Sequence, residues 1–209
     1  MKIVSLLVVS FFVGCSMSYA EIYPSDWKPF VSAEGGVTTM SDSMENGSAV
    51  EVRGGTANDE WQISYGYLRQ EGDTKDTLLP ATLTLHTLNL GIYREFITSY
   101  GFSAKLGVNG GYTVPNLDSN ASETLDNGFS GVFNGGLDYA LTPSLSLGLK
   151  ASYFVFKTDS HRTTRTSETD TVFNSGVPVG TVEIENESHQ DNSLNLNSLV
   201  LTAGVTYRF

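Results

Sequence analysis

The side chains that could act as a general base in this sequence are its three histidines, His86, His161 and His189. On a β-strand, a histidine reaches a hydroxyl nucleophile on its own face when the two residues are spaced by two. None of the histidines stands two residues before a serine, although Thr84 lies two residues before His86. No histidines and carboxylates have the spacing of a metal site either. We therefore expect no catalytic residue, no metal and no cofactor.

The only cysteine, Cys15, lies within a segment that is typical of an export signal. Residues 3–13 are an apolar run too short to span a membrane as a helix, and Ser18 and Ala20 are small enough for a signal peptidase. We expect residues 1–20 to be a cleaved signal peptide. An alternative stays open, because the residues that end in Cys15 resemble a lipoprotein box, in which the thiol would carry lipid.

The charge balance is strongly acidic, with 12 basic against 23 acidic residues and a net charge of −11. Such a chain is a poor partner for nucleic acid. The acids are concentrated, since 15 of the 23 fall in the four long connections that we assign below. Acidic connections would also repel phosphate groups unless divalent cations bridge them.

The elements that must position these side chains are β-strands, because no helical periodicity of useful length follows residue 21. Segments of period two, rich in Gly, Ser, Thr, Tyr and Leu, recur instead. We predict eight strands, at about 30–38, 49–56, 60–69, 83–95, 100–112, 128–140, 144–158 and 195–209.

The connections between these strands alternate between short and long, and the long ones cover about 39–48, 70–82, 113–127 and 159–194. This alternation is typical of bacterial outer-membrane barrels, which have short periplasmic turns, long external loops and an even number of strands. We predict an all-β, antiparallel, up-and-down, eight-stranded transmembrane β-barrel over residues 30–209. Residues 21–29 would be a periplasmic lead-in, with both termini in the periplasm.

The two faces of each predicted strand differ in polarity. In 60–69, Trp61, Ile63 and Tyr65 alternate with Gln62 and Ser64, which predicts an apolar wall toward lipid and a polar interior filled by side chains.

Two strands break this alternation, at Leu83 and Leu85 and again at Leu194 and Leu196. Either a β-bulge restores the facing at each break or these leucines lie beyond the membrane.

Charged residues also occur on the face that should line the interior. They are Glu34, Glu51, Arg53, Arg94, Lys105, Asp138, Lys150 and Arg208. Charges in a confined space of low dielectric must pair. They could form a gated ion path, but eight strands leave an interior just wide enough for side chains, which favours a plug of salt bridges.

The last residues of the chain carry aromatic side chains at Tyr207 and Phe209. This ending resembles the C-terminal signal that the barrel assembly machinery recognises, and the whole mature chain resembles small barrels of the OmpA and OmpX types. The resemblance implies a monomeric, non-enzymatic surface protein of the outer membrane that contacts lipids and lipopolysaccharide and contributes to envelope integrity. The alternatives are a narrow, low-conductance channel and a barrel enzyme that modifies lipid A.

The longest connection, 159–194, itself reads as two strands around a turn signal at Asn174-Ser175-Gly176. We expect a hairpin that extends two strands beyond the membrane and presents an exposed strand edge, as in the OmpX-type family. Such an edge could bind a ligand on a host surface by strand pairing, or the hairpin could be a surface shield without a partner.

Overall fold

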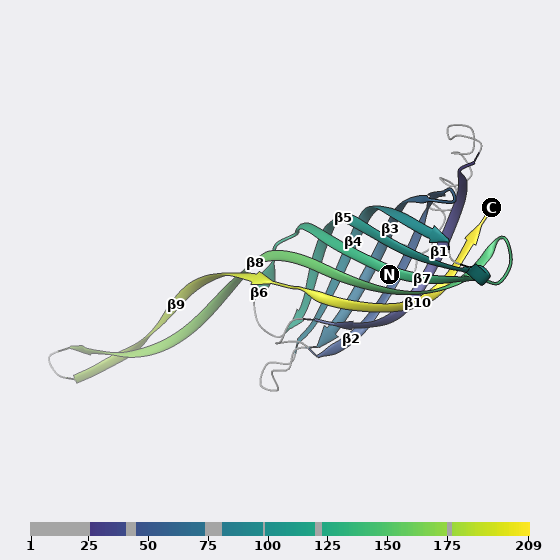
Figure 1. Ribbon diagram of the computed structural model, residues 1–209. Coiled ribbons are helices and arrows are strands. Elements are labelled where there is room, and N and C mark those ends of the chain that lie inside the picture. Colours follow the sequence, from purple (N-terminus) through teal and green to yellow (C-terminus); the bar gives the residue numbers. More distant parts are fainter. Residues whose placement is uncertain (1–25, 41–44, 74–80, 98, 120–122, 175–176) are drawn as a thin grey trace.

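The computed structural model describes residues 26–40, 45–73, 81–97, 99–119, 123–174 and 177–209 (Figure 1). The predicted signal peptide and most of the predicted lead-in lie outside these residues, as do Ser175 and Gly176 of the predicted hairpin turn. The described residues contain no helix that is long and apolar enough to cross a membrane.

Ten strands and one 3-10 helix, η1 (Ser99–Gly101), make up the described fold. The strands are β1 (Lys28–Thr39), β2 (Asn46–Ala57), β3 (Trp61–Asp73), β4 (Ala81–Ile97), β5 (Phe102–Ser119), β6 (Glu123–Leu125), β7 (Gly128–Ala140), β8 (Leu145–Asn174), β9 (Val177–Asn195) and β10 (Ser198–Arg208). All of them except β6 and β9 pair antiparallel in chain order, and β10 pairs with β1. The predicted closed, eight-stranded, up-and-down barrel is therefore confirmed.

Short connections lie at one end of the barrel, which we call the turn end. In the β2–β3 connection, the Asn58 side-chain oxygen accepts hydrogen bonds from the backbone N–H groups of Glu60 (2.9 Å) and Trp61 (2.6 Å). The β4–β5 connection uses positive φ angles at Tyr100 (69°) and Gly101 (81°). Tyr100, predicted to begin a strand, therefore lies in the turn, because a left-handed backbone ends strand pairing.

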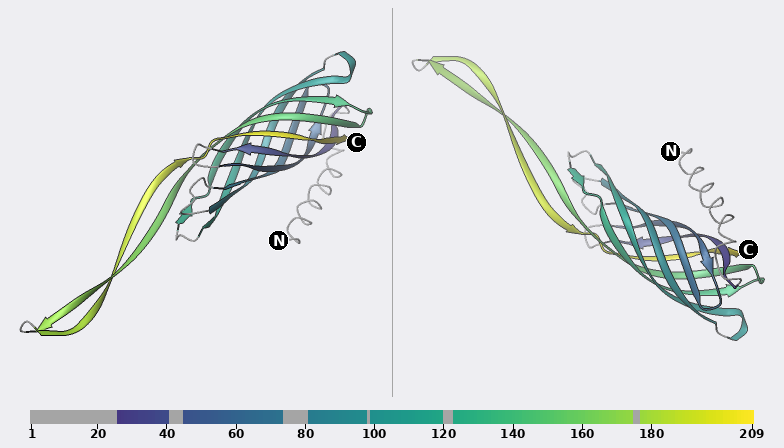
Figure 2. Two further views of the ribbon diagram at one scale, coloured as in Figure 1. Left: turned by 90° about the horizontal axis from the view of Figure 1, so that it is seen from below. Right: turned by 90° about the horizontal axis from the view of Figure 1, so that it is seen from above.

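At the other end, called the ribbon end, β8 leaves the barrel and pairs with β9 from Lys157–Asn195 to Asn174–Val177. This two-stranded ribbon, residues 157–195, projects far beyond the barrel (Figures 1 and 2). It is the hairpin that the sequence pattern predicted. At its root, β6 pairs with the outer edge of β8, which makes a short three-stranded sheet.

The predicted connection 113–127 is largely strand in the structure. β5 runs to Ser119 and pairs with β4 along its whole length, up to Ala81–Ser119. The sequence estimate ended this strand at Tyr112 because the residues that follow lose the apolar alternation. Two strands can pair through their backbones without an apolar face where they extend beyond the lipid. The predicted strand therefore ended too early.

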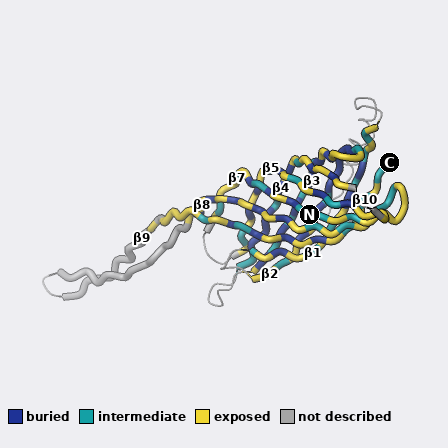
Figure 3. The backbone as a smooth tube through the Cα atoms, in the orientation of Figure 1, coloured by how far each residue is buried: buried dark blue, intermediate teal, exposed yellow. Residues whose placement is uncertain are grey.

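Inward and outward residues alternate along most of the barrel wall (Figure 3), and an exception is the end of β2, where residues 53–57 are all buried. Leu88 and Leu90 face outward and are exposed by 61% and 69%, whereas Leu83 and Leu85 are buried inside the barrel. The β3–β4 and β4–β5 registers contain no shift at this point. The explanation by a β-bulge was therefore wrong at Leu83 and Leu85, since these leucines simply point inward.

Candidate functional site

The centre of the barrel interior holds a compact group of four charged side chains. Glu34 from β1 and Glu51 from β2 are both ion-paired with Lys150 from β8 and with Arg53 from β2. The Lys150 Nζ lies 2.7 Å from Glu34 Oε2, and Arg53 Nε lies 3.6 Å from Glu51 Oε1. All four side chains are buried, so water screens these pairs little. We call this group the central ion cluster.

Two further ion pairs lie between the central ion cluster and the turn end. Lys105 from β5 pairs with Asp138 from β7. Arg208 Nη2 lies 2.5 Å from Glu95 Oε2. Together with the central ion cluster, these pairs place four cations against four carboxylates in the interior, so the described interior charges balance.

The prediction for Arg94 was wrong, and Glu95 was missed. Arg94 is exposed on the outside of β4, where its guanidinium lies over aromatic rings of the wall, whereas Glu95 is buried inside. A signal for this was present in the sequence, because the outward alternation of Leu88, Leu90 and Ile92 continues to residue 94. The other seven predicted residues lie in the three ion-paired groups inside the barrel.

Uncharged polar side chains form hydrogen bonds toward the ribbon end. The Gln70 side-chain oxygen accepts from Thr38 Oγ1 (3.0 Å) and Ser198 Oγ (2.6 Å), which joins β1, β3 and β10. Thr113 Oγ1 contacts Thr87 Oγ1 at 2.8 Å, and it lies 2.9 Å from Ser130 Oγ. The Thr113 bonds tie neighbouring strands together, and the Gln70 bonds join strands that do not pair with each other.

The interior closes at the ribbon end with apolar side chains, which the sequence prediction of a polar interior missed. This apolar cap consists of Leu68, Leu83, Leu85, Val132, Phe154, Phe156 and Leu196. Phe154 and Phe156 are 0% and 1% exposed, and their ring centroids lie 6.3 Å apart. The cavity beside the central ion cluster has a volume of about 20 Å³, which is the space of about one water molecule. Side chains therefore fill the middle of the barrel and its ribbon end, and a cavity of about 200 Å³ lies at the turn end, beside Glu95 and Arg208.

Two of the three histidines, His86 and His161, have side chains that the structure describes, and their hydrogen-bond partners there are a tyrosine and two aspartates. His86 lies on the wall beside Tyr67, whose hydroxyl is 2.6 Å from His86 Nδ1. His161 lies at the root of the ribbon, with Nδ1 2.8 Å from Asp191 Oδ1 and Nε2 3.2 Å from Asp126 Oδ2. Hydrogen bonds that the His161 ring donates to the carboxylate of Asp191, and then to that of Asp126, raise the pKa of His161 above its usual 6.5.

These contacts join the β6–β7 connection to β9 through His161. The side chain of His189 lies outside what the structure describes. Among the described residues, no three histidine, cysteine or acidic side chains come together as a group that could hold a metal ion.

The C-terminal residues complete the barrel wall at the turn end. The Phe209 N–H donates to the Pro29 carbonyl at 3.0 Å, and Arg208 N–H donates to the Ser144 carbonyl at 2.8 Å. The Tyr207 and Phe209 rings face outward and meet edge to face, with centroids 5.1 Å apart. Recognition of these two residues by the assembly machinery stays a prediction.

Comparison with solved structures supports the same architecture. Neisserial surface protein A is 15% identical with a TM-score of 0.57, covering 88% of this chain and 97% of its own. The outer membrane protein OprG from Pseudomonas aeruginosa is 14% identical with a TM-score of 0.54, and the match covers 88% of this chain and 96% of OprG. A major outer membrane protein from Thermus thermophilus is 17% identical with a TM-score of 0.51, and the match covers 88% of this chain and 99% of that protein. At these identities the likeness concerns the fold alone.

No curated protein sequence matches this chain significantly. A family model does, because the model of the outer membrane protein beta-barrel domain matches residues 6–209. The match spans all of the barrel strands and the ribbon. The chain therefore belongs to the family of outer membrane β-barrel domains and is a protein of the bacterial outer membrane.

Proposed function

We propose that the protein is a non-enzymatic surface barrel that holds the ribbon outside the cell for contact with external ligands. The observation that carries this proposal is the continuity of β8, which runs from the barrel wall into the ribbon as one strand of 30 residues. An extension of this kind places residues far from the lipid surface, where adhesion or envelope contacts occur.

The orientation follows from the two ends of the barrel. The turn end holds short connections and both barrel termini, whereas the ribbon end holds the longer connections. Outer-membrane barrels keep short turns in the periplasm. We therefore place the N- and C-termini in the periplasm and the ribbon outside, on a monomer that contacts lipids and lipopolysaccharide through its wall.

The proposed contact surface is the free edge of the ribbon. In the described part of the chain, β9 pairs with β8 alone, so the other edge of β9 presents backbone N–H and C=O groups. An extended segment of a ligand on a host surface can add to such an edge through main-chain hydrogen bonds.

A channel is the weaker alternative, because the filled interior leaves no continuous space for ions. The balanced ion pairs occupy the middle of the barrel, and the apolar cap closes the ribbon end. An ion would have to displace buried aromatic rings and break paired charges, and both steps are costly. Planar-bilayer recordings should accordingly give no stable conductance.

Deletion of residues 162–187 tests the proposed function. The barrel strands keep all of their pairings in this variant, so it should still shift in gel mobility on boiling, as folded barrels do. Binding of labelled cells or envelope proteins to the purified barrel should be lost. A control variant lacks residues 41–44, which connect β1 to β2 in the sequence, and should bind as the unaltered protein does.

Two outcomes would contradict the proposal. Retained binding after deletion of the ribbon would place the contact surface elsewhere, and a change in the mass of lipid A in cells that make the protein would indicate an enzyme.

A further inference from the structure

Arg94 is a cation on the outer wall of the barrel, surrounded by apolar side chains. Across the strands it is the register partner of Trp61 on β3 and of Leu106 on β5. Along β4 its outward neighbours are Ile92 and Phe96, which are exposed by 46% and 43%. The Arg94 guanidinium carbon lies 5.5 Å from the Trp61 ring centroid and 5.4 Å from the Phe96 ring centroid. Two aromatic rings therefore hold this guanidinium by cation–π contacts.

Among the described residues, no carboxylate neutralises this charge. Arg94 takes part in none of the ion pairs found there, and its chain neighbour Glu95 points inward to Arg208. The contrast is Arg69, an arginine of the same wall nearer the ribbon end, which is ion-paired with Glu71. A cation without a counter-charge next to hydrocarbon is costly, so Arg94 needs an anion within its reach.

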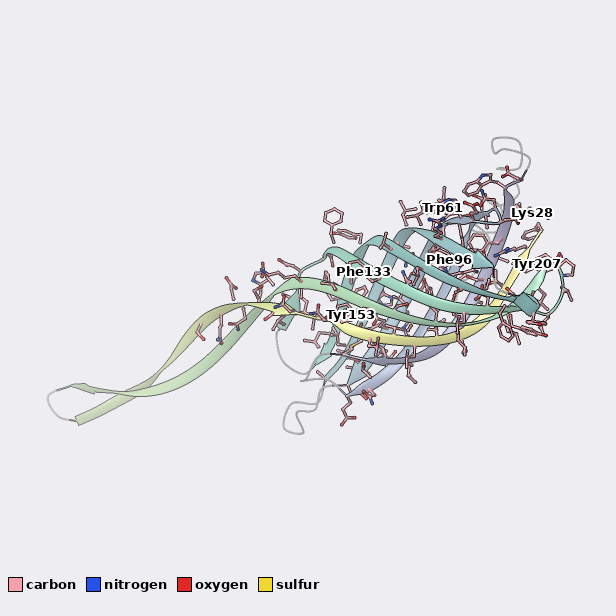
Figure 4. All side chains as sticks on the ribbon, in the orientation of Figure 1. Lys28, Trp61, Phe96, Phe133, Tyr153 and Tyr207 are labelled. Atoms are coloured by element: carbon pink, nitrogen blue, oxygen red, sulfur yellow. The ribbon has the colours of Figure 1, made fainter. Side chains whose placement is uncertain are left out.

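The position of Arg94 along the wall indicates which anion is available. It lies three residues before the end of β4 at Ile97, which is roughly 10 Å along the strand from the turn. Trp61 is the first residue of β3, and aromatic rings mark the membrane interface in barrels. Trp61 and Phe96 are labelled in Figure 4, on neighbouring strands of the wall. Arg94 therefore lies where phospholipid headgroups meet hydrocarbon.

We propose that Arg94, held between Trp61 and Phe96, binds the phosphate group of a membrane phospholipid in the leaflet at the turn end. The planar guanidinium offers two parallel N–H donors to phosphate oxygens, which makes a bidentate, charge-assisted contact. The aromatic rings fix the guanidinium plane and therefore reduce the entropy lost on binding. The acyl chains of the same lipid would cover Leu106 and Ile92.

Native mass spectrometry of the detergent-solubilised protein tests the proposal. The protein is titrated with phosphatidylglycerol and, separately, with a galactosyl diacylglycerol that has the same acyl chains but no phosphate. We expect the unaltered protein to prefer phosphatidylglycerol. Arg94→Gln should lower that preference about fivefold, the contribution of one cation at a membrane surface. Arg69→Gln is the matched control and should leave the preference unchanged, because Glu71 already neutralises Arg69.

A second variant separates the geometry of the site from its charge. Arg94→Lys keeps the charge and loses the planar fork, so its preference should fall between those of the unaltered protein and of Arg94→Gln. Its gel mobility before and after boiling shows whether the barrel is closed. Equal affinity of the unaltered protein for both lipids, or an equal loss in Arg69→Gln and Arg94→Gln, would overturn the proposal. Unaltered preference in Arg94→Lys would overturn the part assigned to the aromatic rings.

Discussion

Replacing Lys150 by methionine should destabilise the barrel strongly, because Lys150 is shared by two buried carboxylates. Its side chain is 8% exposed, and those of Glu34 and Glu51 are 9% and 5% exposed. Without Lys150, two carboxylates face the single guanidinium of Arg53. Removing one partner of a buried ion pair costs about 3–5 kcal/mol, since an uncompensated charge stays in a medium of low dielectric.

Restoring the charge balance should recover most of this loss. The double variant Lys150→Met with Glu51→Gln leaves one carboxylate, Glu34, facing one guanidinium. We expect its free energy of unfolding to lie within about 2 kcal/mol of the unaltered protein. Lys157→Met is the control on the same strand, because Lys157 is exposed and its loss should change stability by less than about 0.5 kcal/mol.

Urea unfolding of the barrel in phospholipid vesicles, followed by tryptophan fluorescence and gel mobility, measures all three variants. A cost below about 1 kcal/mol for Lys150→Met would refute the reasoning. It would mean that water hydrates the central ion cluster, and the filled interior that argues against a channel would have to be given up.

Three further results are expected. Phe154→Ala removes a fully buried ring of the apolar cap and should cost about 3–5 kcal/mol of unfolding free energy, whereas Phe133→Ala, on the outer face of β7 with 61% exposure, should cost less in the same urea titration. Deleting Phe209 should reduce the yield of assembled barrel in cells, measured by heat-dependent gel mobility, and leave the ribbon unaffected; a normal yield would argue against its role as an assembly signal. The pKa of His161 is raised by its two aspartate partners. The stabilisation that the charged imidazole gives the ribbon root is therefore fully present just below pH 6.5 and is lost as the pH rises through the raised pKa. NMR titration of the imidazole should show this, and Asp191→Asn should lower the measured pKa; an unchanged value would show that the contact has no effect.

The barrel could be predicted from the sequence because period-two alternation and alternating connection lengths are properties of individual strands. Outward residues contact lipid and must therefore be apolar. Their apolar side chains recur at every second position of the sequence, as at Leu145, Leu147 and Leu149. The ribbon was predictable for a similar reason, since a turn signal divides two segments of strand-forming residues. The antiparallel fold then follows from chain order.

The composition of the interior was harder to predict, because inward residues have to match only one another. Phe154 and Phe156 continue the inward face on which Lys150 stands. The sequence of β8 alone does not predict that Leu83 and Leu85 of β4 contact these rings. The contact depends on how the strands are staggered around the closed barrel. The same limit hid the partner of Arg208, which comes from a strand more than a hundred residues away.

The uninterrupted course of β8 has a mechanical consequence. A pull on the tip of the ribbon acts along β8, and β8 is hydrogen-bonded to β7 on one side and β10 on the other within the wall. These bonds lie perpendicular to the strand, so an axial force loads many of them at once in shear instead of opening them one by one. The wall thus resists extraction through the combined strength of two ladders, so a force on the ribbon is shared by the whole barrel wall.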